Sequence, residues 1–314
     1  MVIEMNRSEK KLRIVFMGTP EFAVPSLQIL LHHRYEVVGV ITAPDKPGGR
    51  GMQLQQSAIK KFAVERGLKV LQPVKLKEES FLNELKSLQP DLQIVVAFRM
   101  LPEVVWQLPA IGTFNLHGSL LPQYRGAAPI NWAIINGETE TGVTTFFLQH
   151  EIDTGKILFR EKIPVGENET AGELHDSMKM IGAELVLKTV QAIESGSYPQ
   201  LDQQDNGHLK KAPKIFTEHC LINWENSISV IFNQIRGLSP YPAAFTHLNK
   251  KVLKILRAKK IFASHSLPAG EIFTDGKTYL HFTAADGFIA VEELKMEGKK
   301  QMGVQEFLRG FRLT

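Results

Sequence analysis

The fold is decided first by the apolar run LRIVFM at residues 12–17, which ends at Gly18 and is typical of a buried β-strand. The same rhythm continues along the N-terminal half, with helical spacing at 22–31 and 58–66 and further strand-like runs at 37–41 and 94–98. Strands that are apolar on both sides occur in parallel sheets whose two faces are covered by helices. We therefore predict an α/β fold with a doubly wound, mostly parallel sheet, whose ligands lie at the carboxyl ends of the strands.

The second half of the chain has a different pattern. A polar, turn-rich stretch at 196–211 lacks periodicity and predicts a linker, following a long amphipathic helix expected at 171–194. Beyond the linker, one helical stretch precedes short β runs separated by turn residues such as Asp275-Gly276, which is typical of a small barrel. The expected organisation is a polar extension at 1–11, an α/β domain at 12–195, the linker at 196–211 and a barrel domain at 212–314.

Composition and charge exclude some classes of protein and bear on the partners of this one. The 314 residues are 43% hydrophobic and 22% charged, which excludes a wholly disordered or fibrous protein. With Cys220 as the only cysteine, no apolar leader in residues 1–11 and no run approaching 18 apolar residues, we expect a soluble protein of the reducing cytoplasm. Residues 206–314 carry 16 Lys or Arg against 9 Asp or Glu, whereas residues 1–205 carry 21 against 24. This asymmetry fits a polyanionic partner for the C-terminal part, although a solvated lysine-rich surface explains the charge equally well.

The segment TFNLHGSLLPQYRG at residues 113–126 carries the chemistry. Strand alternation sets Phe114 and Leu116 on one face and Asn115 and His117 on the other. The glycine after the imidazole ends the strand, so both polar side chains would project where such a sheet presents ligands. A lone histidine is more often hydrogen-bonded in a core, but the polar alternation favours a site. An amide beside an imidazole suits acyl transfer, in which the amide donates to an oxyanion and the imidazole handles protons.

Asp153, within HEIDTG at 150–155, is the candidate carboxylate for this pair. Asp-Thr-Gly is also a common turn composition, and spacing alone favours the turn. No residue is a good covalent nucleophile, because Cys220 lies outside the α/β half and Ser119 lacks the G-x-S-x-G context, so direct transfer is preferred. The histidines form no H-E-x-x-H motif and predict no metal site. The G-x-G-x-x-G fingerprint is absent after Gly18, which argues against a nicotinamide or flavin oxidoreductase.

A long set of motifs resembles the formyltetrahydrofolate-dependent formyltransferases. These are NLHGSLLPQYRGAAP at 115–129, ETGVT at 140–144, DTG at 153–155, VFMGTPEFA at 15–23, DKPGGRG at 45–51 and RGLSPYP at 236–242. Within that family the chain is most similar to the members that act on initiator methionyl-tRNA. The resemblance implies a Rossmann-like catalytic domain followed by an OB-like barrel that helps to hold the tRNA. The family often has Tyr-Gly where this chain has Phe98-Arg99-Met100, a departure near the expected pterin pocket.

The resemblance also implies roles for individual residues. Asn115, His117 and Asp153 would form the catalytic trio. The donor 10-formyltetrahydrofolate would contact a loop made of Ser119, Leu120, Leu121 and Pro122, in which Leu121-Pro122 is a candidate cis peptide. From their charge and position, we expect five cations to contact the tRNA: Lys46 and Arg50 on the 45–56 loop and Lys250, Lys251 and Lys254 in the barrel. We expect the 45–56 loop to be mobile in the free protein because of its three glycines and its polar tail. No metal, membrane or obligate protein partner is implied.

The implied reaction is direct attack of the methionyl α-amine on the formyl carbon. Asn115 and a protonated His117 would stabilise the oxyanion, while Asp153 would hold the imidazole and relay the proton. Two alternatives stay open at this point. One is a formyltransferase for an amino-sugar nucleotide, and the other is a non-catalytic RNA-binding protein, which would have no reason to keep the three polar residues together.

Overall fold

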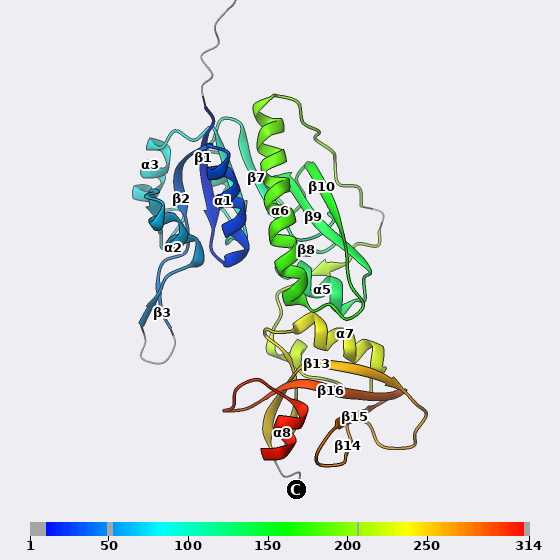
Figure 1. Ribbon diagram of the computed structural model, residues 1–314. Helices are drawn as coiled ribbons and strands as arrows, with labels where there is room; N and C mark the ends of the chain where they lie inside the picture. Colours follow the sequence, from blue (N-terminus) through cyan, green and yellow to red (C-terminus); the bar gives the residue numbers. More distant parts are fainter. Residues whose placement is uncertain (1–10, 49–52, 206, 311–314) are drawn as a thin grey trace, which may run out of the picture. The chain divides into compact units, whose positions relative to one another are not determined.

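The computed structural model describes residues 11–48, 53–205 and 207–310 of the chain (Figure 1). The described residues fall into two compact units. The first unit lies within Met1–Pro122, Gly142–Lys162 and Ser177–His208, and the second within Gln123–Thr141, Ile163–Asp176 and Leu209–Thr314. No helix in the described ranges is both long enough and apolar enough to span a bilayer. Segments of the two units alternate along the sequence, since Gln123–Thr141 and Ile163–Asp176 of the second unit interrupt the first.

The first unit is built on a seven-stranded sheet in the order β10-β9-β7-β6-β1-β2-β5. Its strands are β1 (Arg13–Gly18), β2 (Glu36–Ile41), β5 (Val70–Leu71), β6 (Leu92–Val96), β7 (Gly112–His117), β9 (Glu140–Phe147) and β10 (Ile157–Pro164). The five strands from β7 to β5 are parallel, whereas β9 runs antiparallel to β7. The predicted mostly parallel α/β sheet is confirmed.

Helices cover both faces of this sheet. They are α1 (Val24–His32), α2 (Ala58–Glu65), α3 (Glu79–Ser87), α4 (Glu103–Trp106) and α6 (Ala171–Glu194), with a short 3₁₀ turn at η1 (Glu21–Ala23). Helix α6, which has the predicted bounds, packs so closely on β7 that a Cβ at Gly182 would lie 2.7 Å from the side chain of Leu116. On the opposite face, Leu85 of α3 and Val105 of α4 share a core with Val15 of β1. Side chains of β7 that point away from α6 therefore face the α4 side of the sheet.

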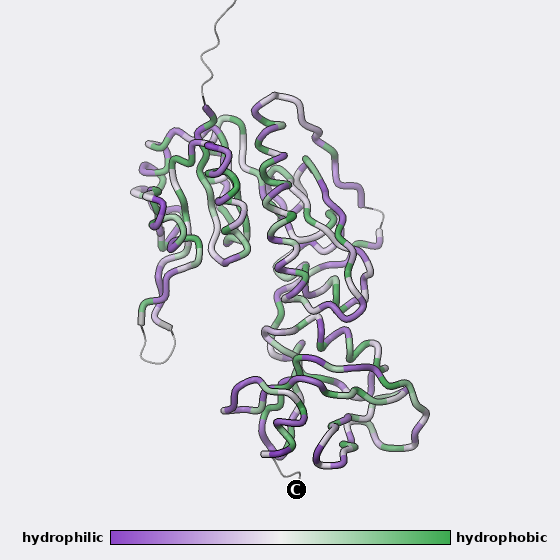
Figure 2. Tube along the Cα trace, in the orientation of Figure 1, coloured by the Kyte–Doolittle hydropathy of each residue, from purple (hydrophilic) through white to green (hydrophobic). Residues whose placement is uncertain are grey.

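The predicted loop at 45–56 has paired arms. Strands β3 (Lys46–Gly48) and β4 (Gln53–Gln55) form an antiparallel hairpin, whose described residues are mostly hydrophilic (Figure 2). Asp45 anchors its base through hydrogen bonds from Lys60 at 2.5 Å and from Gln72 at 2.8 Å. The Lys60 ammonium lowers the pKa of the Asp45 carboxyl below its usual range. Arg50 and the tip on which the expected mobility depends lie outside the described residues.

The second unit contains a curled antiparallel sheet in the order β12-β13-β16-β15-β14, with β17 beside β16. Its strands are β12 (Ala244–Leu248), β13 (Lys251–Phe262), β14 (Ile272–Thr274), β15 (Leu280–Ala284), β16 (Gly287–Met296) and β17 (Met302–Gly303). This half-barrel confirms the predicted barrel-type domain, and Asp275-Gly276 lies in the turn between β14 and β15 as expected. Register shifts beside Arg257 interrupt the regular pairing of β13 with β16 and promote the curl.

Helix α7 (Ile228–Leu238) packs on the half-barrel because its apolar residues recur at helical spacing. Ile228, Ile231 and Ile235 are buried with Leu253 and Leu294 of the sheet. This is the helical stretch predicted after the linker, and Ser227 is its N-cap, whose side chain accepts a hydrogen bond from the Val230 amide. The remaining elements of the unit are α5 (Pro129–Ile135), α8 (Val304–Gly310), η2 (Thr217–Cys220), and β11 (Lys211–Ala212) paired with β8 (Arg125–Gly126).

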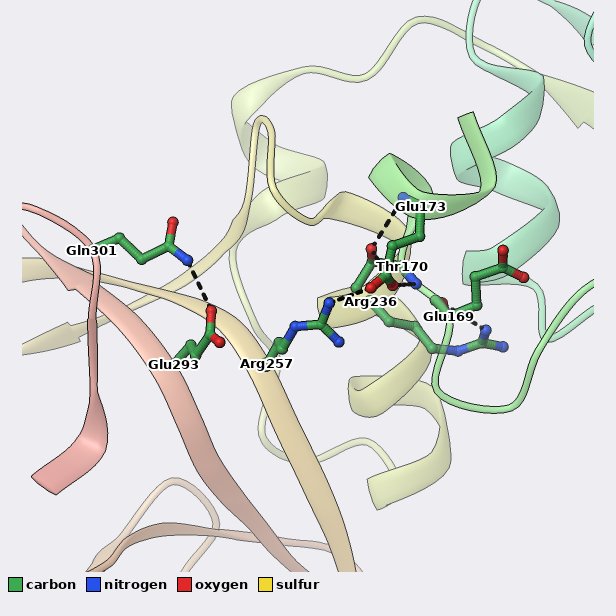
Figure 3. A network of polar contacts seen from close by, with 7 residues as sticks. All are labelled: Glu169, Thr170, Glu173, Arg236, Arg257, Glu293 and Gln301. Carbon is green, nitrogen blue, oxygen red and sulfur yellow. Dashed lines mark hydrogen bonds and ion pairs between the residues drawn. The ribbon is translucent and has the colours of Figure 1, made fainter. Parts of the chain in front are cut away.

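A buried arginine connects segments of the second unit (Figure 3). Arg236 of α7 is 7% exposed, and its Nη1 donates to the backbone oxygens of Gly166 and Glu169 at 3.2 Å each. Burial lowers the pKa of the Arg236 guanidinium from its usual range. Nearby, Arg257 of β13 forms an ion pair with Glu173 in the first turn of α6. These contacts fasten the 166–173 segment to α7 and to the half-barrel.

We expect Arg236→Met to lower the free energy of unfolding by about 1–3 kcal/mol, because the carbonyl oxygens of Gly166 and Glu169 would lose their hydrogen bonds from a buried guanidinium. Urea denaturation at constant pH measures the change. Lys259→Met is the matched control, since that lysine is 72% exposed and its loss should cost no more than about 0.5 kcal/mol. Equal effects of the two substitutions would contradict this assignment.

Candidate active site

Strand β7 sets two polar side chains on the face opposite α6. Leu116 packs beneath Gly182, so its neighbours Asn115 and His117 point to the other face, as the alternation predicted. The antiparallel register places Asn115 beside Phe146 and His117 beside Thr144 of β9. The side-chain amide of Asn115 makes no hydrogen bond within the described parts of the chain, so it is a donor available to a ligand.

Asp153 lies beside the imidazole. Its Oδ2 is 3.9 Å from Nδ1 of His117, and the two side chains are only 13% and 7% exposed. This distance is that of an ion pair rather than a hydrogen bond, as is common for catalytic groups before a substrate binds. Spacing alone favoured a plain turn at Asp153; the structure shows a turn residue whose carboxylate also faces His117.

Close backbone packing holds this turn against the end of β9. A Cβ at Gly155 would lie 1.6 Å from the carbonyl oxygen of Phe147, so only glycine allows the approach. The backbone amide of Phe147 donates to the carbonyl oxygen of Lys156 at 3.0 Å. Asp153 has φ of 56°, a left-handed conformation that aspartate tolerates better than most residues. The path of the backbone therefore directs the carboxylate towards β7.

Apolar side chains surround the imidazole. The ring of Phe146 meets that of His117 edge to face, with centroids 6.5 Å apart. Phe146 in turn packs with Leu121 and Ile157 in a small buried cluster. Low local polarity strengthens the interaction of the imidazole with a nearby charge, which suits both the carboxylate and an oxyanion that forms during a reaction.

One hydroxyl fixes the loop that follows His117. Thr144 Oγ1 donates to the carbonyl oxygen of Ser119 at 2.6 Å and accepts from the amide of Leu121 at 3.1 Å. The loop also needs Gly142, since a Cβ there would lie 2.5 Å from the side chain of Leu120. The Leu121-Pro122 peptide is cis, as expected. The four predicted folate-site residues thus form one loop, held directly beside His117.

Among the described residues, no group of three or more His, Cys, Asp or Glu side chains could hold a metal ion. The site instead combines an amide donor, an imidazole and a carboxylate beside an ordered, partly apolar loop. Such a set can stabilise an oxyanion and move a proton without a covalent intermediate.

Comparison with known proteins identifies the family. The Formyl transferase domain family matches residues 12–190, and the Formyl transferase C-terminal domain family matches residues 214–312. The chain belongs to the formyltransferase family. It is 56% identical to methionyl-tRNA formyltransferase of Phocaeicola vulgatus and 52% identical to that of Bacteroides thetaiotaomicron, with 98% of both chains covered in each case.

A solved formyltransferase structure has the same fold. The N-formyltransferase from Helicobacter canadensis, crystallised with folinic acid and dTDP-3-aminofucose, superposes with a TM-score of 0.68 at 23% identity. The match covers 93% of this chain and 100% of that one. The chain is therefore a formyltransferase. HypX from Aquifex aeolicus, whose structure was solved in complex with tetrahydrofolic acid, shares the fold with a TM-score of 0.62 at 19% identity, over 96% of this chain and 48% of that one.

The departure from the family pattern at Phe98-Arg99-Met100 has a local structural role in this formyltransferase. Arg99 donates to the carbonyl oxygens of Pro73 and Val74 at 2.5 and 2.9 Å, which ties the segment after β6 to the segment after β5. Met100 is exposed. The arginine therefore stabilises the carboxyl edge of the sheet.

The predicted RNA-contacting cations differ in exposure and in their contacts with the protein. Lys46 is exposed on β3, and Lys250 and Lys251 are exposed at the turn between β12 and β13. Lys254 is half-buried, and its ammonium donates to the carbonyl oxygen of Pro242 at 2.9 Å. Three nearby cations of β13 form ion pairs: Arg257 with Glu173, Lys259 with Glu292 and Lys260 with Glu167. Within the described residues, Lys250 and Lys251 have no ion-pair partner.

Two residues of the site were not assigned a role from the sequence. Gly142 and Thr144 lie in the ETGVT motif, but their function depends on the direction and register of β9. Because β9 is antiparallel to β7, Thr144 lies directly across from His117. A threonine in an apolar strand, two residues after Gly142, was the only available indication.

We expect Thr144→Val to lower the free energy of unfolding by about 1–3 kcal/mol, because the Ser119 oxygen and the Leu121 amide would each lose a partner in a buried loop. Valine nearly preserves the shape, so packing changes little. Urea denaturation tests this, with Thr144→Ser as the control that keeps the hydroxyl. A valine variant as stable as the serine variant would show that the hydroxyl does not hold the loop.

Proposed function

We propose that this formyltransferase moves the formyl group of 10-formyltetrahydrofolate to the free α-amine of methionine on initiator methionyl-tRNA, for translation initiation in the cytoplasm. The observation that carries the proposal is the likeness at 52–56% identity to methionyl-tRNA formyltransferases over 98% of the chain. The amino-sugar alternative is supported only by structures such as the Helicobacter canadensis enzyme, at 23% identity. A non-catalytic RNA-binding role does not fit a member of an enzyme family.

The reaction begins with the free amine, which is abundant near neutral pH because α-amino groups titrate near roughly 8. Its lone pair forms a bond to the formyl carbon, and the electrons of the C=O bond move to oxygen. When this tetrahedral species collapses, the bond between carbon and the folate nitrogen breaks. The amine loses one proton and the folate nitrogen gains one, so no oxidant or covalent enzyme intermediate is needed.

Three side chains serve the steps of this reaction, in which an oxyanion forms and a proton is transferred. The Asn115 amide donates to the developing oxyanion. Nδ1 of His117 faces Asp153, so we assign Nε2 to the formyl oxygen. The carboxylate of Asp153 stabilises positive charge on the ring and relays the proton from the amine towards the folate nitrogen, directly or through water.

The two substrates have separate candidate contacts. The loop from Ser119 to Pro122, which the Thr144 hydroxyl orders, would hold the folate next to His117. The tRNA would contact Lys46 and Arg50 of the first unit and Lys250, Lys251 and Lys254 of the second. The surplus of basic residues in 206–314 supports a polyanionic partner.

An assay with two acceptors tests the function. Purified protein, 10-formyltetrahydrofolate and either methionylated initiator tRNA or a dTDP-amino sugar are incubated, and formylated products are separated by mass. We expect efficient transfer to methionyl-tRNA and little to the sugar. Transfer to the sugar alone would overturn the proposal.

We expect Asn115→Ala and His117→Ala each to lower kcat by about 100-fold or more, with KM for methionyl-tRNA changed little, because these groups act mainly in the transition state. Steady-state kinetics with both substrates varied separates kcat from KM. His150→Ala is a matched control, because that imidazole is 81% exposed and pairs with Glu103 instead. Near-normal turnover by the His117 variant would remove the imidazole from the mechanism.

We expect replacement of Lys250 and Lys251 by Ala to weaken tRNA binding and to reduce the slope of log Kd against log salt by about 1–2. The slope falls because fewer phosphates are neutralised on binding, so fewer counterions are released from the tRNA. Filter binding across a salt series measures this slope. Replacing Lys259 and Lys260 is the control, since Glu292 and Glu167 already offset their charge. An equal change of slope in both double variants would show that the tRNA does not contact the lysines at the β12–β13 turn in preference to the paired lysines.

A further inference from the structure

The middle of the predicted linker is attached to the turn that carries Asp153. Leu201 and Ile157 exchange two backbone hydrogen bonds, at 2.8 and 2.9 Å, beside the start of β10. Two residues later, Nε2 of Gln203 donates to the carbonyl oxygens of Asp153 and Gly155, at 2.9 Å each. All these residues belong to the first unit. The linker therefore supplies part of the support for the candidate active site.

The Gln203 side chain constrains the turn at Asp153, the residue that carries the candidate catalytic carboxylate. The two hydrogens of one amide group bridge carbonyls two positions apart, so the backbone on both sides of Thr154 is tied to a single side chain. Asp153 has a left-handed conformation, which is less common than the extended or helical ones and which fixed neighbours help to maintain. The direction of its Cα–Cβ bond follows from that backbone. The Gln203 amide thus contacts the backbone that carries the Asp153 carboxylate, which lies 3.9 Å from the His117 imidazole.

Other contacts of the turn act elsewhere. Thr154 Oγ1 donates to the Glu151 carbonyl at 3.0 Å and accepts from Gln149 at 2.9 Å, which stabilises the exposed side of the loop. Gly155 sets the distance to β9. Gln203, in contrast, hydrogen-bonds the backbone carbonyl of Asp153 itself.

We propose that Gln203 is a positioning residue of this enzyme, which keeps the Asp153 carboxylate aligned with the His117 imidazole during formyl transfer. The proposal rests on the catalytic role of Asp153 proposed above. Gln203 touches neither substrate in this account, and its effect passes through the carboxylate. A displacement of a catalytic group by about 1 Å can cost two orders of magnitude in rate, so a single amide group can have a large effect on turnover.

Gln203→Met tests the proposal, because methionine matches the length of glutamine and lacks the amide donors. We expect kcat to fall about 10- to 100-fold, with KM for methionyl-tRNA and KM for the folate within twofold of the unmodified enzyme. The matched control is Gln204→Met, at the neighbouring exposed position, which should leave kcat within twofold. Normal kcat in Gln203→Met, or an equal loss in Gln204→Met, would overturn the proposal.

A double-mutant cycle separates positioning from general support of the fold. If Gln203 acts through the carboxylate, Gln203→Met should lower kcat by less than twofold in an Asp153→Asn background. Loss by the same factor in both backgrounds would show an independent structural effect and overturn the proposal. The unmodified enzyme and Asp153→Asn belong to the same series. Failure of the unmodified enzyme to formylate methionyl-tRNA would refute the proposed function, whereas normal kcat in Asp153→Asn would refute the role of the carboxylate and with it that of Gln203.

Discussion

The antiparallel pairing of β9 with β7 is the constraint on which the candidate active site depends. Through this register, Thr144 lies across from His117 and its hydroxyl holds the loop that begins at Ser119. The same strand ends at Phe147, against whose carbonyl Gly155 packs. Both the loop that would receive the folate and the turn that carries Asp153 are thus fastened to one strand. A shift of that pairing by one residue would turn Thr144 to the opposite face and separate the imidazole from the carboxylate.

Some polar groups of the site hold its backbone in place, whereas others face the expected ligand. The Thr144 hydroxyl both donates and accepts, and the Gln203 amide bonds to two carbonyls, so these supports are satisfied by the protein itself. The Asn115 amide, in contrast, makes no hydrogen bond within the described residues. A fixed donor that needs no rearrangement when charge forms is what oxyanion stabilisation requires.

The pattern of apolar residues was sufficient to predict β1, β2, β6 and β7, the bounds of helix α6 and the common face of Asn115 and His117, because these features depend on neighbours in sequence. The approach of Asp153 to His117 could not be derived in this way, since spacing along a chain does not measure distance across a sheet. The paired arms of the 46–55 hairpin were missed because a glycine-rich, polar stretch has weak local preferences. The linker composition likewise gave no indication that Gln203 would contact the Asp153 turn.

We propose that His117 and Asp153 act as one unit in formyl transfer to methionyl-tRNA. Single-turnover rates of His117→Ala, Asp153→Asn and the double variant test it most directly, with enzyme in excess over methionyl-tRNA and saturating 10-formyltetrahydrofolate. We expect the double variant to be within about threefold of the slower single variant, because either single substitution already breaks the pair of imidazole and carboxylate. A double variant whose loss equals the product of the two single losses would show that the residues act independently and would contradict the account.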